Sequence, residues 1–327
     1  MRIVVLDGYT LNPGDNPWTA IEQLGSLTVY PRTTPAEVVA RARDADVVLT
    51  NKTPLSAETL AALPNLKFIA VLATGYNVVD IAAAAQRQIP VSNVPVYGTD
   101  TVAQHVFATL LSFIHRPFEH DQAIRAGQWQ AAGDFCFWLS PLSELVGKQL
   151  GIVGFGRIGR RTAEVGHALG MSVLAHDVAQ HHPPAYQPFA WRSIDALFAE
   201  SDVVSLHCPQ TADNVRFVNR QLLGRMKPTA ILINAARGGL IEEHDLAEAL
   251  NAGTIAGACL DVVSLEPIAA DNPLLRARNC LLTPHIGWAT VEARRRLMQT
   301  TAENVSRFLA GQPQNVVNGV GAGPART

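Results

Sequence analysis

The chain alternates short apolar runs with longer helical stretches along almost its whole length. Before residue 100 the apolar runs are Ile3–Leu6, Val47–Leu49, Phe68–Leu72 and Pro90–Val94. Stronger runs follow at Leu150–Val153, Ser172–Ala175, Val203–Leu206, Ala230–Ile233, Gly257–Leu260 and Cys280–Leu282. Near-continuous apolar runs of this kind are typical of strands buried on both faces of a parallel sheet. The pattern therefore predicts an α/β protein with doubly wound parallel sheets.

Two long helices mark the predicted domain boundaries. The first runs from Thr101 to Arg116 with one apolar face, and Thr101 together with Gln104 fits a capping box. The second starts at Thr290, which suits an N-cap, and ends at Gly311. We expect a first domain of residues 1–98 plus 290–327 and a second domain of residues 99–289. The chain of a domain split in this way passes twice between the two domains. Two such connections can act as hinges for a cleft that closes.

The segment Asp121–Val146 breaks the alternation, because its periodicity is weak and its aromatic residues include Phe137 and Trp138. It could be a surface loop that covers an apolar patch of its own domain. Exposed aromatic surface is costly, so we favour an arm at a subunit interface and expect a homodimer.

Composition narrows the classes of function. The 327 residues, 48% of them hydrophobic, suffice for two domains with separate cores. A net charge of −2 gives no reason to expect nucleic acid or an anionic membrane as a partner. No apolar run approaches the roughly 18 residues of a membrane-spanning helix. The four widely spaced cysteines are expected to be reduced thiols in the cytoplasm. The ten histidines include no H-E-x-x-H motif, and we expect no metal.

A glycine-rich turn lies near the middle of the chain, directly after the predicted strand Leu150–Val153. Gly154 would permit the tight turn, Gly156 the approach of backbone to a pyrophosphate, and Gly159 close packing of helix on strand. The helix that follows would offer free N–H groups and its positive end to the diphosphate. The arrangement predicts a dinucleotide cofactor.

Asp177 follows the next predicted strand. A carboxylate there can accept hydrogen bonds from the ribose hydroxyls and would repel a 2′-phosphate, which favours NAD over NADP. The alternative is an aspartate that only caps a turn at the end of the strand.

The later predicted strands also end in polar clusters. In an open α/β sheet, ligands bind outside the carboxyl ends of the strands, so we expect these clusters to share one rim. Arg237, Glu266 and His285 are the residues there that are capable of chemistry. Taken singly, they could be a solvated turn arginine, a loop carboxylate and a strand-end histidine. A guanidinium, a carboxylate and an imidazole on successive strand ends favour a catalytic site.

Several motifs, in order and spacing, resemble those of the D-isomer-specific 2-hydroxyacid dehydrogenases, within the glycerate dehydrogenase/hydroxypyruvate reductase branch. The resemblance extends to about Val317 and rests on residues 74–80 (TGYNVVD), 92–95 (SNVP), 102–106 (VAQHV), 151–159 (GIVGFGRIG), 234–239 (NAARGG), 260–262 (LDV) and 283–290 (TPHIGWAT). It implies a Rossmann domain inserted into a flavodoxin-like substrate, or lid, domain. Gln104 replaces the glutamate of many relatives and Trp288 replaces a small residue, and both are similar to the glycerate branch.

The resemblance also implies roles for single residues. Arg237 resembles the arginine that binds the substrate carboxylate and keto oxygen, His285 the acid/base and Glu266 its hydrogen-bonding partner. The backbone of Ala73, Thr74 and Gly75 resembles the substrate-carboxylate loop. Phe137 and Trp138 resemble an arm that reaches the partner's active site. Positions similar to those that line the cofactor are Thr74, Arg157, Ile158, Asp177, Cys208, Ala235, Ala236, Asp261 and Gly287.

The function expected from these features is NAD-dependent hydride transfer between a small 2-oxo acid and its 2-hydroxy acid, with glycerate/hydroxypyruvate or glyoxylate as the substrate. Close alternatives on the same fold are formate and phosphite dehydrogenases, which Glu266 and Thr74 disfavour. An NAD-sensing corepressor would keep the same three residues, although no extended partner-binding tail is evident. A purely structural Rossmann module is disfavoured by the convergent triad. The sequence does not fix which 2-oxo acid is bound, because such substrates differ by about 1–3 kcal/mol of pocket contacts.

Overall fold

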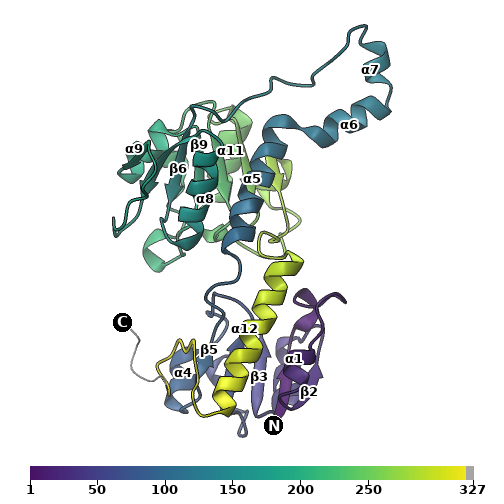
Figure 1. Cartoon of the computed structure of the whole chain (residues 1–327), viewed down its shortest axis with the longest axis vertical. Coiled ribbons are helices and arrows are strands. Elements are labelled where there is room, and N and C mark those ends of the chain that lie inside the picture. The colour runs from purple at the N-terminus through teal and green to yellow at the C-terminus, as the bar shows by residue number, and fades with distance from the viewer. Residues whose placement is uncertain (322–327) are drawn as a thin grey trace. The chain divides into compact units, whose positions relative to one another are not determined.

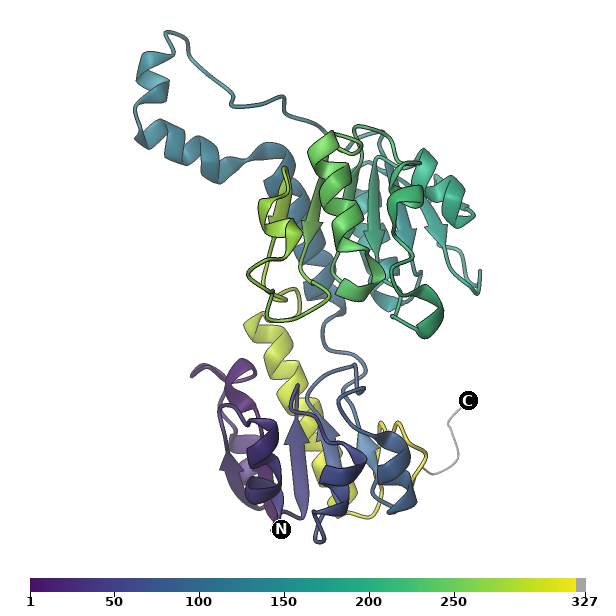
Figure 2. The same cartoon turned by 180° about the vertical axis from the view of Figure 1, so that it is seen from behind.

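The computed structural model describes residues 1–321, so residues 322–327 of the predicted first domain lie outside the described part. The chain divides into two compact units (Figures 1 and 2). Unit 1 comprises Met1–Tyr97 together with the chain from Ala289 onward, and unit 2 comprises Gly98–Trp288. Each boundary falls one residue before the position expected from the sequence.

Unit 1 contains a five-stranded sheet in the order β2-β1-β3-β4-β5, and all of these pairs are parallel. This is the 2-1-3-4-5 order of flavodoxin-like folds. The strands are β1 (Arg2–Val5), β2 (Ser26–Val29), β3 (Val47–Thr50), β4 (Phe68–Val71) and β5 (Val91–Ser92). Its α-helices are α1 (Thr19–Glu22), α2 (Val38–Ala42), α3 (Ala57–Ala61), α4 (Ile81–Gln86) and α12 (Val291–Leu309), and two 3-10 turns lie at Gly8–Thr10 and Pro35–Glu37.

The C-terminal helix α12 packs in unit 1, beside strands that are about 200 residues away in sequence (Figure 1). Thr290 is its N-cap, as predicted, and accepts a hydrogen bond from the amide of Ala293 at 3.2 Å. The ring of Phe308 stacks on that of Phe68 in β4, with 4.5 Å between the centroids. Aromatic stacking and burial thus fix the last helix on the sheet of unit 1.

Unit 2 contains a seven-stranded parallel sheet in the order β12-β11-β10-β9-β6-β7-β8. Counted from β6, this is the dinucleotide-binding order 3-2-1-4-5-6 with a seventh strand added at one edge. The strands are β6 (Gln149–Val153), β7 (Ser172–His176), β8 (Phe189–Trp191), β9 (Val203–Leu206), β10 (Ile231–Asn234), β11 (Gly257–Leu260) and β12 (Cys280–Leu282). The predicted fold class, with two doubly wound parallel sheets, is confirmed.

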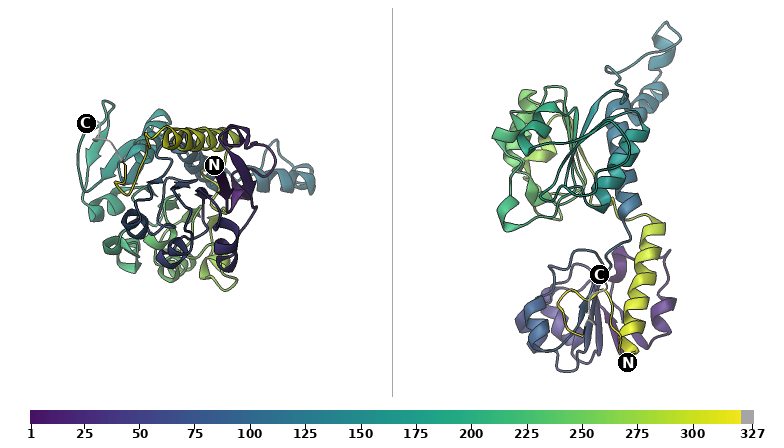
Figure 3. Two further views of the ribbon diagram at one scale, coloured as in Figure 1. Left: turned by 90° about the horizontal axis from the view of Figure 1, so that it is seen from below. Right: turned by 60° about the vertical axis from the view of Figure 1, so that its left-hand side comes forward.

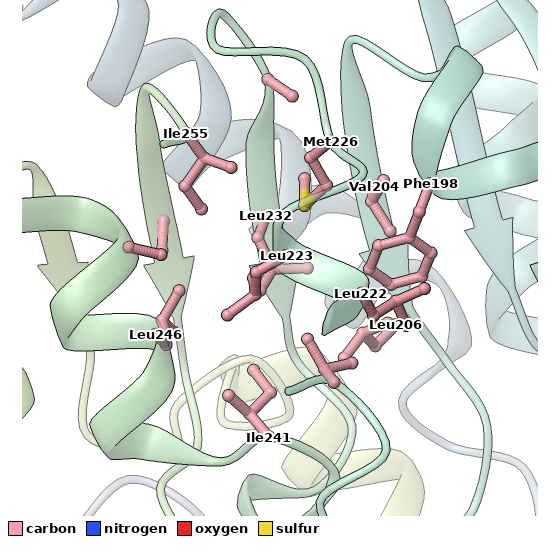
Figure 4. Close-up of a cluster of buried hydrophobic side chains, with 14 of the residues drawn as sticks. Phe198, Val204, Leu206, Leu222, Leu223, Met226, Leu232, Ile241, Leu246 and Ile255 are labelled. Carbon is pink, nitrogen blue, oxygen red and sulfur yellow. The ribbon is translucent and has the colours of Figure 1, made fainter. Parts of the chain in front are cut away.

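Successive residues of the unit 2 strands supply two apolar clusters on opposite faces of the sheet. In β9, for example, Val204 joins one cluster and Val203 the other. The first cluster packs under α9 (Ile194–Glu200), α10 (Arg220–Leu223) and α11 (Glu243–Ala252), as Figure 4 shows. The second packs under α5 (Thr99–His115) and α8 (Arg157–Ala168). Burial on both faces explains why these strands read as continuous apolar runs.

The two strands missing from the sequence prediction are β2 and β8. Both lie at a sheet edge. In β2 the exposed and half-buried residues alternate, and all three residues of β8 are half-buried. The alternation in β2 leaves no continuous apolar run to indicate a strand. The residues of β8, Phe189–Trp191, are apolar throughout, so the same criterion does indicate a strand there.

The predicted capping box at Thr101 is wrong. Helix α5 starts at Thr99, its N-cap is Gly98 without a side-chain hydrogen bond, and Thr101 is buried in the first turn. The carboxylate of Asp100 also lies in that turn, where the helix dipole favours a negative charge. The predicted apolar face is present, since Val106 and Leu110 are buried in the core of unit 2.

The segment expected to form an arm is partly helical. Helices α6 (Pro117–Arg125) and α7 (Gln128–Ala131) are followed by an irregular stretch that returns to β6. This segment projects away from the sheet of its own unit in Figures 1 and 2 and in the right-hand view of Figure 3. Its own contacts include a hydrogen bond of 3.1 Å from the indole of Trp129 to the carbonyl of Phe135.

Candidate active site

The glycine-rich turn connects β6 to α8. Gly154 has a φ of +92°, and a Cβ there would lie 2.5 Å from the amide nitrogen of Cys208, so both the conformation and the space require glycine. A Cβ on Gly159 would overlap the carbonyl oxygen of Gly154. Because glycine has no Cβ, the helix can start close against the turn. Beside Gly156 the space is open, and no side chain caps α8. The turn therefore offers the N-terminus of a twelve-residue helix to an anion, as a dinucleotide diphosphate requires.

Asp177 lies beside this turn. Its Oδ2 atom accepts a hydrogen bond of 2.6 Å from the amide of Phe155, inside the glycine-rich turn, and its Oδ1 atom accepts one of 3.3 Å from the amide of Ala179. Burial raises the pKa of the Cys208 thiol at the end of β9, and the negative charge of Asp177 adds to the rise. The thiol is therefore protonated and uncharged at neutral pH.

Arg237 lies in the turn after β10. The fully buried Asn234 holds this turn, because its Oδ1 accepts from the amide of Ala236 at 3.0 Å and its Nδ2 donates to the carbonyl of Arg237 at 2.9 Å. A Cβ on Gly238 would overlap the backbone of Val263, so the turns after β10 and β11 touch directly. The guanidinium of Arg237 is exposed and in reach of a ligand at the rim of the sheet.

Glu266 lies in the loop after β11, and a buried carboxylate on α11 fixes that loop. Glu243 is 9% exposed and accepts hydrogen bonds from the amide and hydroxyl of Ser264, at 2.6 and 2.9 Å, and from the side-chain amide of Asn272 at 2.8 Å. The Oε2 atom of Glu266 lies 2.7 Å from Nδ1 of His285. Two of the three predicted catalytic residues are thus in direct contact.

His285 follows β12 and has a left-handed backbone, with a φ of +55°. Its amide donates to the carbonyl of Asp261 at 2.8 Å, and both carboxylate oxygens of Asp261 accept from the next two amides, Ile286 and Gly287, at 2.8 Å each. Burial acts to raise the pKa of Asp261, but hydrogen bonds from His105, Thr283 and these amides outweigh it and hold the pKa below its ordinary value. Asp261 is therefore an anion that anchors the loop of His285.

Most of the cofactor positions expected from the sequence lie on this same rim of unit 2, around the glycine-rich turn and the ends of β9, β10, β11 and β12. Ala73, Thr74 and Gly75 lie instead in unit 1, in the loop after β4. There Thr74 donates to the carbonyl of Val94 at 2.8 Å and its own carbonyl accepts from Asn93 at 2.7 Å. Their roles remain predictions.

Three polar residues that hold the loops of this rim were not predicted from the sequence. They are His105, Asn234 and Glu243. Asn234 ends an apolar strand, and that position could have indicated its function. Glu243 lies on α11 amid other polar residues, so no local pattern separates it from surface positions. His105 lies on α5 between Gln104 and Val106, and its partners are too distant in sequence for any local pattern to indicate them.

Comparison with known proteins places the chain. The family model for the NAD-binding domain of D-isomer-specific 2-hydroxyacid dehydrogenases matches residues 107–287. The chain belongs to this family. It is an oxidoreductase with a dinucleotide-binding domain, as predicted. Among residues 1–321 no helix is long and apolar enough to cross a membrane. The same residues contain no group of three or more His, Cys, Asp or Glu side chains suited to a metal ion.

Two relatives support the predicted branch of the family. A hydroxypyruvate reductase of Blautia hydrogenotrophica is 49% identical over 97% of this chain and all of its own length. A glycerate dehydrogenase of Methylorubrum extorquens is 41% identical over 87% of this chain and 89% of its own. The structure of an NADPH-dependent glyoxylate/hydroxypyruvate reductase of Sinorhizobium meliloti, solved with NADP and malonate, superposes with a TM-score of 0.82 at 30% identity, over 100% of this chain and 99% of that one.

Proposed function

We propose that this family member is a D-2-hydroxyacid dehydrogenase that uses NAD(H) and acts on hydroxypyruvate/glycerate or glyoxylate. The observation that carries the proposal is the 2.7 Å contact between His285 and Glu266 on the rim that also carries Arg237 and the glycine turn. The names of the relatives suggest the substrates.

Arg237 would bind the substrate. A 2-oxo acid presents a carboxylate and a carbonyl oxygen side by side, and a planar guanidinium can donate to both. Asn234 holds the backbone of the turn that carries Arg237, and Nη1 of Arg237 donates to the carbonyl of Ala236 at 2.7 Å. These contacts orient the guanidinium before the substrate arrives. Preorganised donors also stabilise the negative charge that develops on the carbonyl oxygen.

His285 would exchange the proton. The contact with Glu266 occupies Nδ1, so Nε2 is the ring nitrogen left to face the substrate oxygen. In the direction of reduction, Nε2 donates a proton to the oxygen as negative charge forms on it, and in oxidation it removes that proton. Glu266 orients the imidazole and is itself held through the loop that Glu243 fixes.

The residues of unit 2 fit a dinucleotide. The open space at Gly156, the uncapped start of α8 and the carboxylate of Asp177 match the diphosphate and ribose of NAD. When bound, NADH supplies the hydride. Arg157, Ile158, Cys208, Ala235, Ala236, Asp261 and Gly287 are proposed to line the same site. From unit 1, Thr74 is proposed to join them, and the backbone of Ala73–Gly75 to bind the substrate carboxylate.

The proposal is tested by measuring the turnover of hydroxypyruvate, glyoxylate, pyruvate and bulkier 2-oxo acids with NADH and with NADPH. We expect turnover with hydroxypyruvate or glyoxylate and NADH to exceed that with the bulkier acids. NADH binding without turnover of any 2-oxo acid would favour the NAD-sensing alternative and overturn the proposal.

We also propose a homodimer in which Asp121–Val146 lies at the interface. The proposal rests on exposed aromatic side chains in this arm, among them Phe135 at 84% and Trp138 at 66% exposure. Apolar surface of this kind is costly in water and marks interaction sites. Light scattering should give the mass of a dimer for the wild type and of a monomer for the Phe135→Ser/Trp138→Ser double variant. A monomeric wild type would refute it.

The cytoplasm is the proposed location. All four cysteines, each within the described residues, are free thiols, and a reducing compartment keeps them so. Recovery of the native protein in the cytoplasmic fraction checks this, and recovery outside that fraction would refute it.

A further inference from the structure

His105 lies on α5, far in sequence from every residue with a proposed role in the chemistry, yet it touches the loop of His285. Its Nε2 atom is 3.1 Å from Oγ1 of Thr283 and 3.2 Å from Oδ1 of Asp261. Its ring also packs near Gly287, where a Cβ would meet the ring at 3.3 Å. The side chain is only 15% exposed, so water competes little for these contacts.

The hydrogen bonds assign the proton on His105. The hydroxyl of Thr283 donates to Oδ1 of Asp261 at 2.6 Å, so its single proton is already used. The carboxylate of Asp261 can only accept. Both neighbours of Nε2 therefore present lone pairs, and Nε2 must carry a hydrogen that it donates to them.

The same carboxylate fixes the backbone at His285. Asp261 is 5% exposed and receives hydrogen bonds from Ile286 and Gly287, the two amides after His285. Few residues other than glycine adopt a φ of +55°, and such a conformation persists where the surroundings impose it. A donor that fixes the orientation of Asp261 and Thr283 thus fixes the backbone of the proposed acid/base.

We propose that His105 is a positioning residue: its Nε2–H group anchors the Asp261–Thr283 pair, and through it the loop that places His285. The inference rests on the proposed function for its effect on turnover, but the anchoring itself is open to a measurement that needs no turnover. His105 touches neither reacting atom and acts through Asp261.

Three variants separate the effect of the hydrogen-bond donor from the effect of ring packing. His105→Leu removes the donor and keeps an apolar side chain of similar bulk, His105→Gln keeps an N–H donor, and Thr283→Val removes the shared hydroxyl. His115→Leu, at the exposed end of the same helix, is the matched control. Each is assayed for amide hydrogen exchange of the peptide covering Thr283–Trp288, for NADH affinity, and for kcat and KM.

In His105→Leu and in Thr283→Val we expect faster exchange at Ile286 and Gly287. We also expect a fall in kcat of about 10- to 100-fold, as a small misplacement of a catalytic group produces. The substrate KM should change less than about twofold, because Arg237 remains in place. His105→Gln should restore most of both the exchange protection and kcat, and His115→Leu should match the wild type.

Unchanged exchange and kcat in His105→Leu would overturn the inference, as would equal losses in His105→Leu and His105→Gln, which would assign the effect to ring packing. If His105→Leu does not fold, Thr283→Val and His105→Gln still decide between these outcomes. A wild type that turns over no 2-oxo acid refutes the proposed function, whereas the exchange result still tests the anchoring.

Discussion

Nδ1 of His285 and Oε2 of Glu266 lie 2.7 Å apart, although one follows β12 and the other lies in the loop after β11. Adjacent parallel strands bring the two loops to the same edge of the sheet. The contact selects Nε2 as the nitrogen that exchanges a proton. The pair therefore defines where the proposed proton transfer takes place and which ring nitrogen carries it.

Replacement of His285 by alanine tests that assignment. We expect kcat for the reduction of the best 2-oxo acid to fall by about 10²–10⁴-fold, the usual contribution of a positioned general acid. NADH affinity, measured by fluorescence quenching, should stay close to that of the wild type, because the glycine turn is untouched. An unchanged kcat would remove His285 from the mechanism.

The glycine turn allows a matched pair of substitutions. Gly159→Ala places a Cβ against the carbonyl of Gly154 and should lower the free energy of unfolding by about 1–3 kcal/mol. Gly156→Ala meets no protein atom within 4 Å and should leave Tm unchanged, while it weakens NADH binding by about tenfold or more. Calorimetry measures the Tm and the unfolding free energy of each variant, and titration with NADH measures its affinity for the cofactor. Full NADH affinity in Gly156→Ala would place the diphosphate elsewhere.

Asp177 is expected to set the choice of cofactor. Its carboxylate is held beside the glycine-rich turn by the amide of Phe155, where it would meet the 2′-phosphate of NADPH. Asp177→Ser should reduce the preference for NADH over NADPH by about tenfold or more, since loss of a like-charge contact is worth at least about 1.4 kcal/mol. The ratio of kcat/KM for the two cofactors measures it. The same ratio before and after substitution would contradict this role.

His207 at the end of β9 predicts a pH dependence of stability. Burial lowers its pKa to about 3, from an ordinary value of 6.5. The folded state keeps this imidazole neutral, and the unfolded state takes up a proton below pH 6.5. Stability is thus fully present above pH 6.5 and is lost as the pH falls toward 3. Between pH 7 and pH 5 the loss from this one group is about 2 kcal/mol.

Urea unfolding of the wild type, His207→Gln and the exposed-site control His244→Gln at these two pH values checks the prediction. The wild type and His244→Gln should lose more stability on acidification than His207→Gln, by about 2 kcal/mol. Equal losses in all three proteins would mean that His207 is accessible to protons in the folded state.

The central strands, the glycine turn and the N-cap at Thr290 were predictable, because each depends on residues that are close together in sequence. Edge strand β2 was missed because its exposed and half-buried residues alternate and leave no continuous apolar run. Edge strand β8 was also missed, although its three residues are all apolar. The cap at Thr101 was misplaced, because the helix already begins at Thr99 and Thr101 is buried in its first turn.

The sequence by itself determined the α/β class, the fingerprint, and the identities of Arg237, Glu266 and His285 as candidates at strand ends. Periodicity and turn chemistry are local properties, and a linear chain displays them. Only the tertiary structure joined His285 to Glu266, placed Glu243 under the loop of Glu266, and brought His105 from α5 to Asp261 and Thr283. These contacts arise where separate elements pack on one sheet, and hydrogen-bond partners distant in sequence leave no pattern in either segment alone.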